Sequence, residues 1–236
     1  MNENGRPHTL CVDIGGTGIK ALVVDDHGAP LTGRFREKTP EQATPEAVVA
    51  IVEKLAAQAG GFDRVSVGFP GVIKNGVVAT APNLDGPWTG FDIDRMLEAR
   101  LGKAVLTEND AAVQGLGAVS GSGLEMVATL GTGLGAALYR DGKLAAGVEI
   151  AHHLFRKRRT YEECLGKKGL KKSGAMKWNR RLREAIRNWE NLFHFDRLYL
   201  GGGNAGLVER PLPANVEIAP NVNGLLGGIA LWKGRA

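Results

Sequence analysis

Two glycine-rich turns, each set between two strand-like segments, constrain this chain more than any other feature of its sequence. Residues 10–14 and 126–130 have the apolar character of buried strands, and each is followed by a glycine turn and a returning strand. Because each turn leads into a strand and not into a helix, neither is a dinucleotide-binding fingerprint, and the Gly-Lys-Ser/Thr of a Walker A loop is absent from the sequence. The two units lie about 118 residues apart and predict an α/β protein with two lobes of like topology.

The segments between and after these units predict the remaining elements. Thr44 at an N-cap, Pro45 at the first helical position and Glu46 in the first turn indicate a helix that ends at the glycines 60 and 61. Asn75-Gly76 and Asp141-Gly142 are typical of tight hairpin turns. The other expected strands are residues 31–37, 65–69, 104–107, 197–200 and 216–219, and the other expected helices are 91–101, 111–119, most of 157–189, and 224–232.

Composition excludes several classes of protein. With 236 residues, 43% of them hydrophobic, the chain can bury a core and is not a disordered tail. Two cysteines, Cys11 and Cys164, can form neither a disulfide framework nor a four-cysteine zinc site, so we expect a reducing, cytoplasmic setting. Since no apolar run reaches 18 residues and residues 1–8 are polar, we expect no membrane span, no signal peptide and no further N-terminal domain.

The first glycine turn, residues 13–18, has the chemistry of an anion site. Glycine allows backbone amides to converge on an anion, Thr17 adds a hydroxyl donor, and Asp13 at the strand end can hold a metal ion directly or through water. The alternative is a plain hairpin whose glycines serve only its backbone conformation. The second turn repeats this chemistry with Gly131, Thr132 and Gly133, and a phosphoryl donor requires a phosphate grip on either side of the transferred group.

Two further segments carry groups that suit a substrate with several hydroxyls. Asp110 follows a strand and opens a helix, where it can accept a proton from a hydroxyl, and Asn109 beside it can bond a neighbouring hydroxyl. The alternative for this pair is an ordinary helix N-cap. Glu149 and His152 lie three residues apart, so they face the same way on a helical turn, although an ordinary polar turn has the same pattern.

Charge is distributed very unevenly along the chain. Residues 156–187 contain thirteen Lys or Arg and only three acids, Glu162, Glu163 and Glu184, which gives this segment a net charge of +10. Since the whole chain has a formal net charge of +5, the remainder carries −5. An ordinary solvated helix alternates signs, and this segment does not, so it is predicted to attract a polyanion such as polyphosphate or nucleic acid.

Taken in order, these motifs resemble those of the ROK sugar kinases, a family of the actin-like ATPase superfamily. The first glycine turn resembles the phosphate-1 turn, residues 108–111 the catalytic motif, and residues 130–135 the phosphate-2 turn. Residues 68–71 and 81–84 with Trp88 are similar to the sugar-side segments, Glu149 and His152 stand where the family has Glu-Leu-Gly-His, and residues 201–203 are similar to the nucleotide-side glycine loop. The resemblance runs over nearly the whole chain.

The resemblance implies an α/β actin-like (ribonuclease H-like) fold with two lobes and an active site in the cleft between them. The first lobe is expected at residues 1–109, joined by the helix at 224–236, and the second at 110–223, which carries the basic segment 156–187. The resemblance also implies a homodimer and Mg²⁺ near Asp13. The family's zinc-binding cysteine cluster is absent from the sequence, so no zinc site is expected.

Within the family the sequence is most similar to the polyphosphate glucokinases, which implies phosphoryl transfer from polyphosphate or ATP to the 6-hydroxyl of glucose or a related hexose. Asp110 is the implied general base, and the implied sugar-binding residues are Asn83, Asn109, Asp110, Glu149 and His152. The implied phosphate-binding residues are Gly15, Gly16, Thr17, Lys20, Gly131, Thr132, Gly133 and Gly202. The implied polyphosphate-binding residues are Arg156, Lys157, Lys167, Lys168, Lys171, Lys172 and Arg180.

The sequence departs from the family pattern after Glu149. Ala151 replaces the family's glycine, and Leu154 and Phe155 occupy the region of an expected sugar-contacting glutamate. Three other interpretations remain: an ATP-only sugar kinase of the same fold, a non-catalytic sugar-binding regulator, and a nucleic-acid-binding protein that uses the basic segment. The last leaves the ordered glycine turns unexplained, so nucleic acid is not the expected partner. No membrane partner is expected either.

Overall fold

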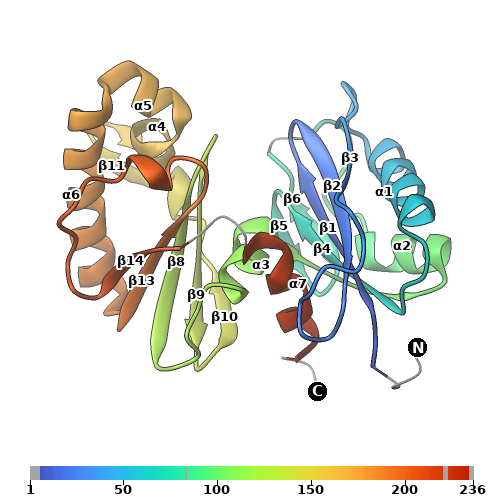
Figure 1. Cartoon of the computed structure of the whole chain (residues 1–236). Coiled ribbons are helices and arrows are strands. Elements are labelled where there is room, and N and C mark those ends of the chain that lie inside the picture. The colour runs from blue at the N-terminus through green and yellow to red at the C-terminus, as the bar shows by residue number, and fades with distance from the viewer. Residues whose placement is uncertain (1–5, 83, 220–222, 234–236) are drawn as a thin grey trace. The chain divides into compact units, whose positions relative to one another are not determined.

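The computed structural model describes residues 6–82, 84–219 and 223–233 (Figure 1). It is a mixed α/β protein that divides into two compact units. Unit 1 contains the chain up to Gly117 and from Gly224 onward, and unit 2 is Ala118–Asn223. Unit 1 therefore includes the helix that begins at Asp110, and unit 2 begins at Ala118.

The sheet of unit 1 brings three strand ends to one edge. Its five strands lie in the order β3-β2-β1-β4-β7. β1 is antiparallel to β2 and parallel to β4, which is parallel to β7, so β1, β4 and β7 end at the same edge. The strands are β1 (Thr9–Gly15), β2 (Gly18–Val24), β3 (Phe35–Glu37), β4 (Arg64–Phe69) and β7 (Ala104–Asn109).

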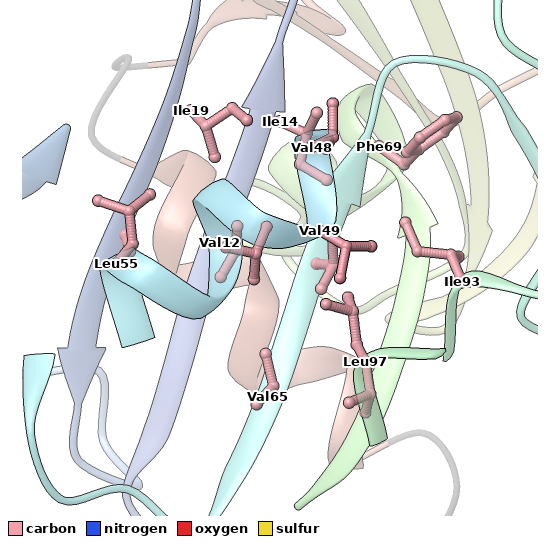
Figure 2. Close-up of a cluster of buried hydrophobic side chains, with 14 of the residues drawn as sticks. Val12, Ile14, Ile19, Val48, Val49, Leu55, Val65, Phe69, Ile93 and Leu97 are labelled. Atoms are coloured by element: carbon pink, nitrogen blue, oxygen red, sulfur yellow. The ribbon is translucent and has the colours of Figure 1, made fainter. Parts of the chain in front are cut away.

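One face of this sheet is covered by α1 (Pro45–Ala59) and α2 (Ile93–Leu101) (Figures 1 and 2). Thr44 caps α1 as expected, because its side chain accepts from the amide of Ala47. Alternate residues of β1 and β2, such as Val12 and Ile19, pack against Val48 and Leu97 of the helices. Each fully buried side chain of this kind contributes roughly 1.5–3 kcal/mol. This core fixes the strands whose ends carry the candidate site.

The opposite face of the sheet is covered by α3 (Asp110–Leu116) and α7 (Asn223–Lys233) (Figure 1). Ser66 of β4 donates to the carbonyl of Gly228, and Trp232 Nε1 donates to the Ser66 hydroxyl at 2.9 Å. Cys11 is buried beside Ile229, and burial raises the pKa of its thiol to about 12. The C-terminal helix is therefore an integral part of unit 1.

Unit 2 repeats the strand order of unit 1. Its sheet runs β10-β9-β8-β13-β14, again with an antiparallel hairpin followed by parallel neighbours. Buried residues such as Met126 and Leu198 pack against Trp178 and Trp189 of α6. The strands are β8 (Leu124–Leu130), β9 (Leu134–Arg140), β10 (Lys143–Gly147), β13 (Arg197–Gly201) and β14 (Val216–Ile218), and the covering helices are α4 (Tyr161–Leu165), α5 (Lys167–Ser173) and α6 (Ala175–Phe193).

A buried carboxylate holds the loop that enters unit 2. Glu125 is 0% exposed and accepts hydrogen bonds from the amides of Ser120, Gly121 and Ser122 and from the Tyr199 hydroxyl. Burial alone raises the pKa of Glu125, but these hydrogen bonds outweigh it and hold the pKa below its ordinary value. The loop is thereby tied to β8 and β13.

The turn and helix predictions differ in accuracy. Both Asn-Gly and Asp-Gly turns are confirmed: β5 (Val72–Lys74) and β6 (Val77–Thr80) meet at Asn75-Gly76, and β9 and β10 at Asp141-Gly142, with positive φ at all four turn residues. The segment expected to be largely helical begins instead with a hairpin of β11 (Leu154–Arg156) and β12 (Arg159–Thr160). Lys157 and Arg158 form its turn at φ of 49° and 59°, without the glycine or asparagine that usually marks such a turn.

Two short 3-10 turns, η1 (Ile150–His152) and η2 (Ala205–Leu207), complete the described elements. No helix of the described residues is long and apolar enough to cross a membrane.

Candidate functional site

The edge of the unit 1 sheet places two carboxylates on either side of a glycine. Asp13 on β1 is in register with Gly68 on β4, which is in register with Glu108 on β7. In-register neighbours project to the same face of a sheet, so Asp13 and Glu108 share the face opposite α1. Gly68 has no side chain in that row. A Cβ on Gly68 would lie 3.5 Å from Asp110 Cα, so the row lies close to the start of α3.

Asp110 lies directly beyond this row, at the first position of α3. Asn109 is the N-cap of α3: its Oδ1 accepts from the Ala112 amide at 3.1 Å, and its Nδ2 donates to the Gly71 carbonyl at 3.1 Å. One Asp110 oxygen accepts from the Ala111 amide at 2.7 Å. The capping role, which the sequence left open, belongs to Asn109, and it fixes the position of the Asp110 carboxylate.

The first glycine turn exposes backbone donors beside an ion pair. Gly16 and Thr17 are exposed, and their amides donate to no acceptor among the described residues. Lys20 Nζ lies 2.9 Å from Asp13 Oδ2, and the two residues are direct partners across the β1–β2 hairpin. The structure thus brings Asp13, Lys20 and the turn amides together. The ammonium of Lys20 contacts Asp13, the carboxylate that was expected to lie near a metal ion.

The second glycine turn also has free backbone amide donors, but different residues pack around it. The amides of Thr132 and Gly133 also donate to no acceptor within the described part of the chain. Asn204 donates from its side chain to the Gly131 carbonyl at 3.1 Å and from its amide to the Leu130 carbonyl at 2.8 Å. A Cβ on Gly202 would lie 2.5 Å from the Leu130 carbonyl oxygen, so this position requires glycine. The Gly201–Gly203 loop therefore packs directly on the second turn.

The basic segment is attached to this same turn. The amide of Lys167, the first residue of α5, donates to the carbonyls of Gly131 and Thr132 at 3.0 and 3.2 Å. Glu162 of α4 accepts from the Leu134 amide at 3.3 Å, and its carboxylate lies where a Gly133 side chain would be. Unit 2 thus joins Gly131–Gly133, Gly202 and the start of α5 in one place.

The cations of residues 156–187 are largely free of acidic partners. Within the described residues only Arg156 and Arg183 form ion pairs, with Glu184 and Glu209. The other two acids of the segment are engaged elsewhere, since Glu162 binds the second glycine turn and Glu163 forms a capping box with Thr160. The exposed basic set, which forms no ion pair there, is Lys157, Arg158, Lys167, Lys168, Lys171, Lys172, Lys177, Arg180 and Arg187.

The remaining predicted sugar residues lie elsewhere in the chain. Glu149 directly precedes η1 and His152 is its last residue. His152 Nε2 lies 4.0 Å from Glu149 Oε2, and both side chains are more than half exposed. Asn83 lies outside the described residues.

Mg²⁺ has a suitable donor set in unit 1. This ion takes oxygen ligands, usually from one or two carboxylates and substrate phosphates while several waters remain. Asp13 and Glu108 supply two carboxylates in one row beside the first glycine turn, with a glycine between them. Among the described residues, no group of three or more His, Cys, Asp or Glu is placed to hold a metal ion. Binding of Mg²⁺ by one or two carboxylates and substrate phosphates does not require such a group.

Sequence reasoning missed two residues that build the second turn. Glu162 was counted only as an acid within the basic segment, and Asn204 only as the end of a glycine loop. Both act across more than 25 positions of the chain, on Leu134 and Gly131, and no local pattern marks them.

The chain belongs to the ROK family, whose model, described as "ROK family", matches residues 9–164. A crystal structure of inorganic polyphosphate/ATP-glucomannokinase from Arthrobacter sp. strain KM is 33% identical, with a TM-score of 0.86 over 98% of this chain and 100% of that one. A ROK family glucokinase from Streptomyces griseus, solved with glucose and AMPPNP, is 21% identical with a TM-score of 0.78 over 95% of this chain and 98% of its own. These likenesses confirm the expected actin-like α/β fold.

A curated relative supports the same placement. Polyphosphate glucokinase from Mycobacterium tuberculosis (strain CDC 1551 / Oshkosh) is 31% identical over 238 residues, which cover 97% of this chain and 90% of that protein. With the family, the fold and near full-length similarity to named kinases in agreement, the chain is a phosphotransferase with a hydroxyl acceptor.

Proposed function

We propose that this protein transfers a phosphoryl group from inorganic polyphosphate or ATP to the 6-hydroxyl of glucose or a closely related hexose. The observation that carries the proposal is the attachment of α5 to the second glycine turn through the amide of Lys167. A helix rich in unpaired lysines thus begins at a turn with free amide donors. The names of the Mycobacterium and Arthrobacter relatives, which include polyphosphate, support the same donor.

Asp110 is the proposed general base. Its carboxylate accepts the proton of the 6-hydroxyl as the sugar oxygen forms a bond to phosphorus and the bond to the leaving phosphate breaks. Asn109 holds Asp110 through the cap of α3 and the bond to Gly71. Asn83, Glu149 and His152 are the proposed partners of the other sugar hydroxyls.

The two glycine turns are the proposed donor grips. The free amides of Gly16, Thr17, Thr132 and Gly133 can each donate to a phosphate oxygen, because no described acceptor uses them. Lys20 adds a charge at the first turn. Asp13 and Glu108 would hold Mg²⁺, which would supply positive charge to offset that of the transferred phosphoryl group. By resemblance to the family, we further propose a homodimer in the cytoplasm.

The test is phosphorylation of glucose with Mg²⁺, run in parallel with polyphosphate and with ATP. Asp110→Asn is expected to lower kcat by about 10²- to 10⁴-fold with either donor, since that is the usual contribution of a general base. Asp141→Asn is the matched control, because asparagine keeps the acceptor that Gly123 uses and tolerates the turn conformation.

Each outcome of this assay decides a different part of the proposal. Activity with ATP alone would support the fold and the base and would remove the proposed role of the basic segment. Activity with neither donor would refute glucose as the acceptor. Equal loss in the two aspartate variants would refute Asp110 as the base.

A further inference from the structure

The charge of Arg181 is buried inside unit 2 without a counter-ion. Arg181 of α6 is 5% exposed, and its Nε has no hydrogen-bond partner among the described residues. No carboxylate of the described residues forms an ion pair with it, although the pairs of Arg156 and Arg183 lie on or beside the same helix. An arginine side chain stays protonated in proteins, and an unpaired buried charge is costly. The Nε donor of Arg181 is therefore open to an anion that the described chain does not supply.

The position of Arg181 on α6 shows where that anion would lie. Residues 181, 184 and 188 are three and four apart, so they share one edge of the helix. Glu184 on this edge pairs with Arg156 of β11 at 3.2 Å, and Asn188 donates to the Tyr161 hydroxyl of α4 at 3.3 Å. The edge that carries Arg181 therefore faces β11 and the start of α4.

The neighbouring turn of α6 extends this contact to α5. Trp178 Nε1, three positions before Arg181, donates to the Leu165 carbonyl at 2.7 Å, at the junction of α4 with α5. Gly169 of α5 lies so close to α4 that a Cβ would be 2.6 Å from the backbone of Cys164. The basic α5 is thus packed tightly against α4, which the turn of α6 before Arg181 also contacts.

The acids in this region are already engaged. Glu184 binds Arg156, Glu162 binds the Leu134 amide, and Glu163 caps α4. The surrounding cations, by contrast, include Lys168, Lys171 and Lys177, which belong to the exposed basic set. Any anion that compensates Arg181 therefore comes from outside the segment.

We propose that Arg181 is a binding residue for one phosphate group of a polyphosphate chain, at a subsite bordered by β11, α4 and α5. The identity of the anion rests on the proposed function, whereas the burial of Arg181 and its unpartnered Nε do not. The planar guanidinium presents paired donors that match two phosphate oxygens, which a lysine cannot do. Arg156 and Glu184, each about one third exposed at 33% and 36%, form the ion pair that joins this edge of α6 to β11.

Thermal unfolding of the full chain, with and without sodium tripolyphosphate at constant ionic strength, tests this inference without sugar or turnover. Arg181→Met removes the buried charge, and Arg187→Met removes one exposed charge from the same helix. In phosphate-free buffer Arg181→Met is expected to unfold at the same or a higher temperature than the parent, because an uncompensated buried charge is lost. Tripolyphosphate is then expected to raise the Tm of the parent and of Arg187→Met and to leave Arg181→Met nearly unchanged.

Calorimetric titration with tripolyphosphate gives the size of the effect. Arg181→Met is expected to weaken binding by about 10- to 100-fold, as for loss of charge-assisted hydrogen bonds, and Arg181→Lys to restore part of it. Arg187→Met is expected to weaken binding by less than about threefold.

Three results would overturn the inference: equal weakening by the two methionine variants, full rescue by lysine, or a lower Tm of Arg181→Met in phosphate-free buffer with its tripolyphosphate response intact. The kinase assay is separate from these measurements. Tripolyphosphate binding that depends on Arg181 in a protein without glucose kinase activity would refute the proposed function and keep the anion site.

Discussion

The two sheets of this protein have the same strand order and opposite chemistry at their glycine turns. In unit 1 the turn between β1 and β2 adjoins the carboxylate of Asp13, and Glu108 and Asp110 lie at the same edge of the sheet, at the end of β7. In unit 2 the turn between β8 and β9 adjoins α5, which carries Lys167, Lys168, Lys171 and Lys172. A shared topology thus provides the same free amides twice, and the attached segments give each turn a different charge.

This difference assigns a separate task to each unit. The acids of unit 1 suit a metal ion and the removal of a proton, whereas the cations of unit 2 suit a long polyanion. Changes in unit 1 chemistry should therefore affect every phosphoryl donor, and changes in the unit 2 cations should affect the polyanionic donor most.

The largest expected effect on stability separates two glycines of unit 2. Gly202 has a φ of +86°, and its Cβ would lie 2.5 Å from the Leu130 carbonyl oxygen, so Gly202→Ala is expected to lower the free energy of unfolding by about 2–4 kcal/mol. No described atom lies within 4 Å of a Cβ on Gly131. Gly131→Ala is therefore expected to change stability by less than about 0.5 kcal/mol. Urea denaturation of both variants measures this.

Steady-state kinetics with both phosphoryl donors give a second test of the Gly131→Ala variant. If the second turn grips phosphate, the methyl group of Gly131→Ala occupies space that the donor uses, and KM for both donors rises while the fold is unchanged. An alanine at residue 131 with unaltered donor KM would mean that this turn is a structural hairpin only.

The next effect concerns the lysines of α5. Changing Lys167, Lys168, Lys171 and Lys172 together to glutamine is expected to raise KM for polyphosphate on the order of tenfold, because each exposed pair contributes about 0.2–1 kcal/mol. The salt dependence of that KM should become shallower, since fewer counter-ions are exchanged on binding. KM for glucose should not change. Steady-state assays at several salt concentrations measure this, and an equal change in the KM for ATP would contradict a donor-specific role.

A further expected effect depends on pH. Glu125→Gln is expected to lower the free energy of unfolding by about 1–3 kcal/mol at neutral pH, because a buried hydrogen-bonded carboxylate is lost. The folded-state pKa of Glu125 is depressed, so its stabilisation is complete above the ordinary value of 4.5 and is lost as the pH falls through the lower folded value. The difference between parent and variant should therefore shrink below about pH 4.5.

The matching position on β1 provides the control for this prediction. Thr9 is buried, and its hydroxyl accepts from Arg64 Nε at 2.9 Å. Thr9→Val should destabilise the protein by an amount that is constant between pH 4 and 7, since threonine does not titrate. Denaturation at several pH values compares the two variants, and a pH-independent loss in Glu125→Gln would refute the assigned role of its charge.

Local sequence signals predicted the fold well where the backbone conformation depends on a few neighbouring residues. The glycine turns, the Thr44 cap and the Asn75-Gly76 turn are set by backbone conformation within a few residues, and the structure has each of them. The β11–β12 turn was missed because Lys157 and Arg158 adopt positive φ without glycine, in a hairpin held by Arg156 and Glu184 across the unit. Glu162 and the burial of Arg181 were missed for the same reason, since both depend on tertiary packing.

The path of the chain has a consequence for how the protein is made. Unit 1 is interrupted by unit 2, and α7 returns to β4, where Gly228 and Trp232 contact Ser66. During synthesis on the ribosome the whole of unit 2 therefore emerges before the first sheet receives its last helix. Until then the sheet face around Cys11, Leu22 and Val24 lacks the cover of Ile229. A nascent chain stalled after unit 2 thus has an apolar surface on unit 1 that chaperones can recognise, and the final helix removes it.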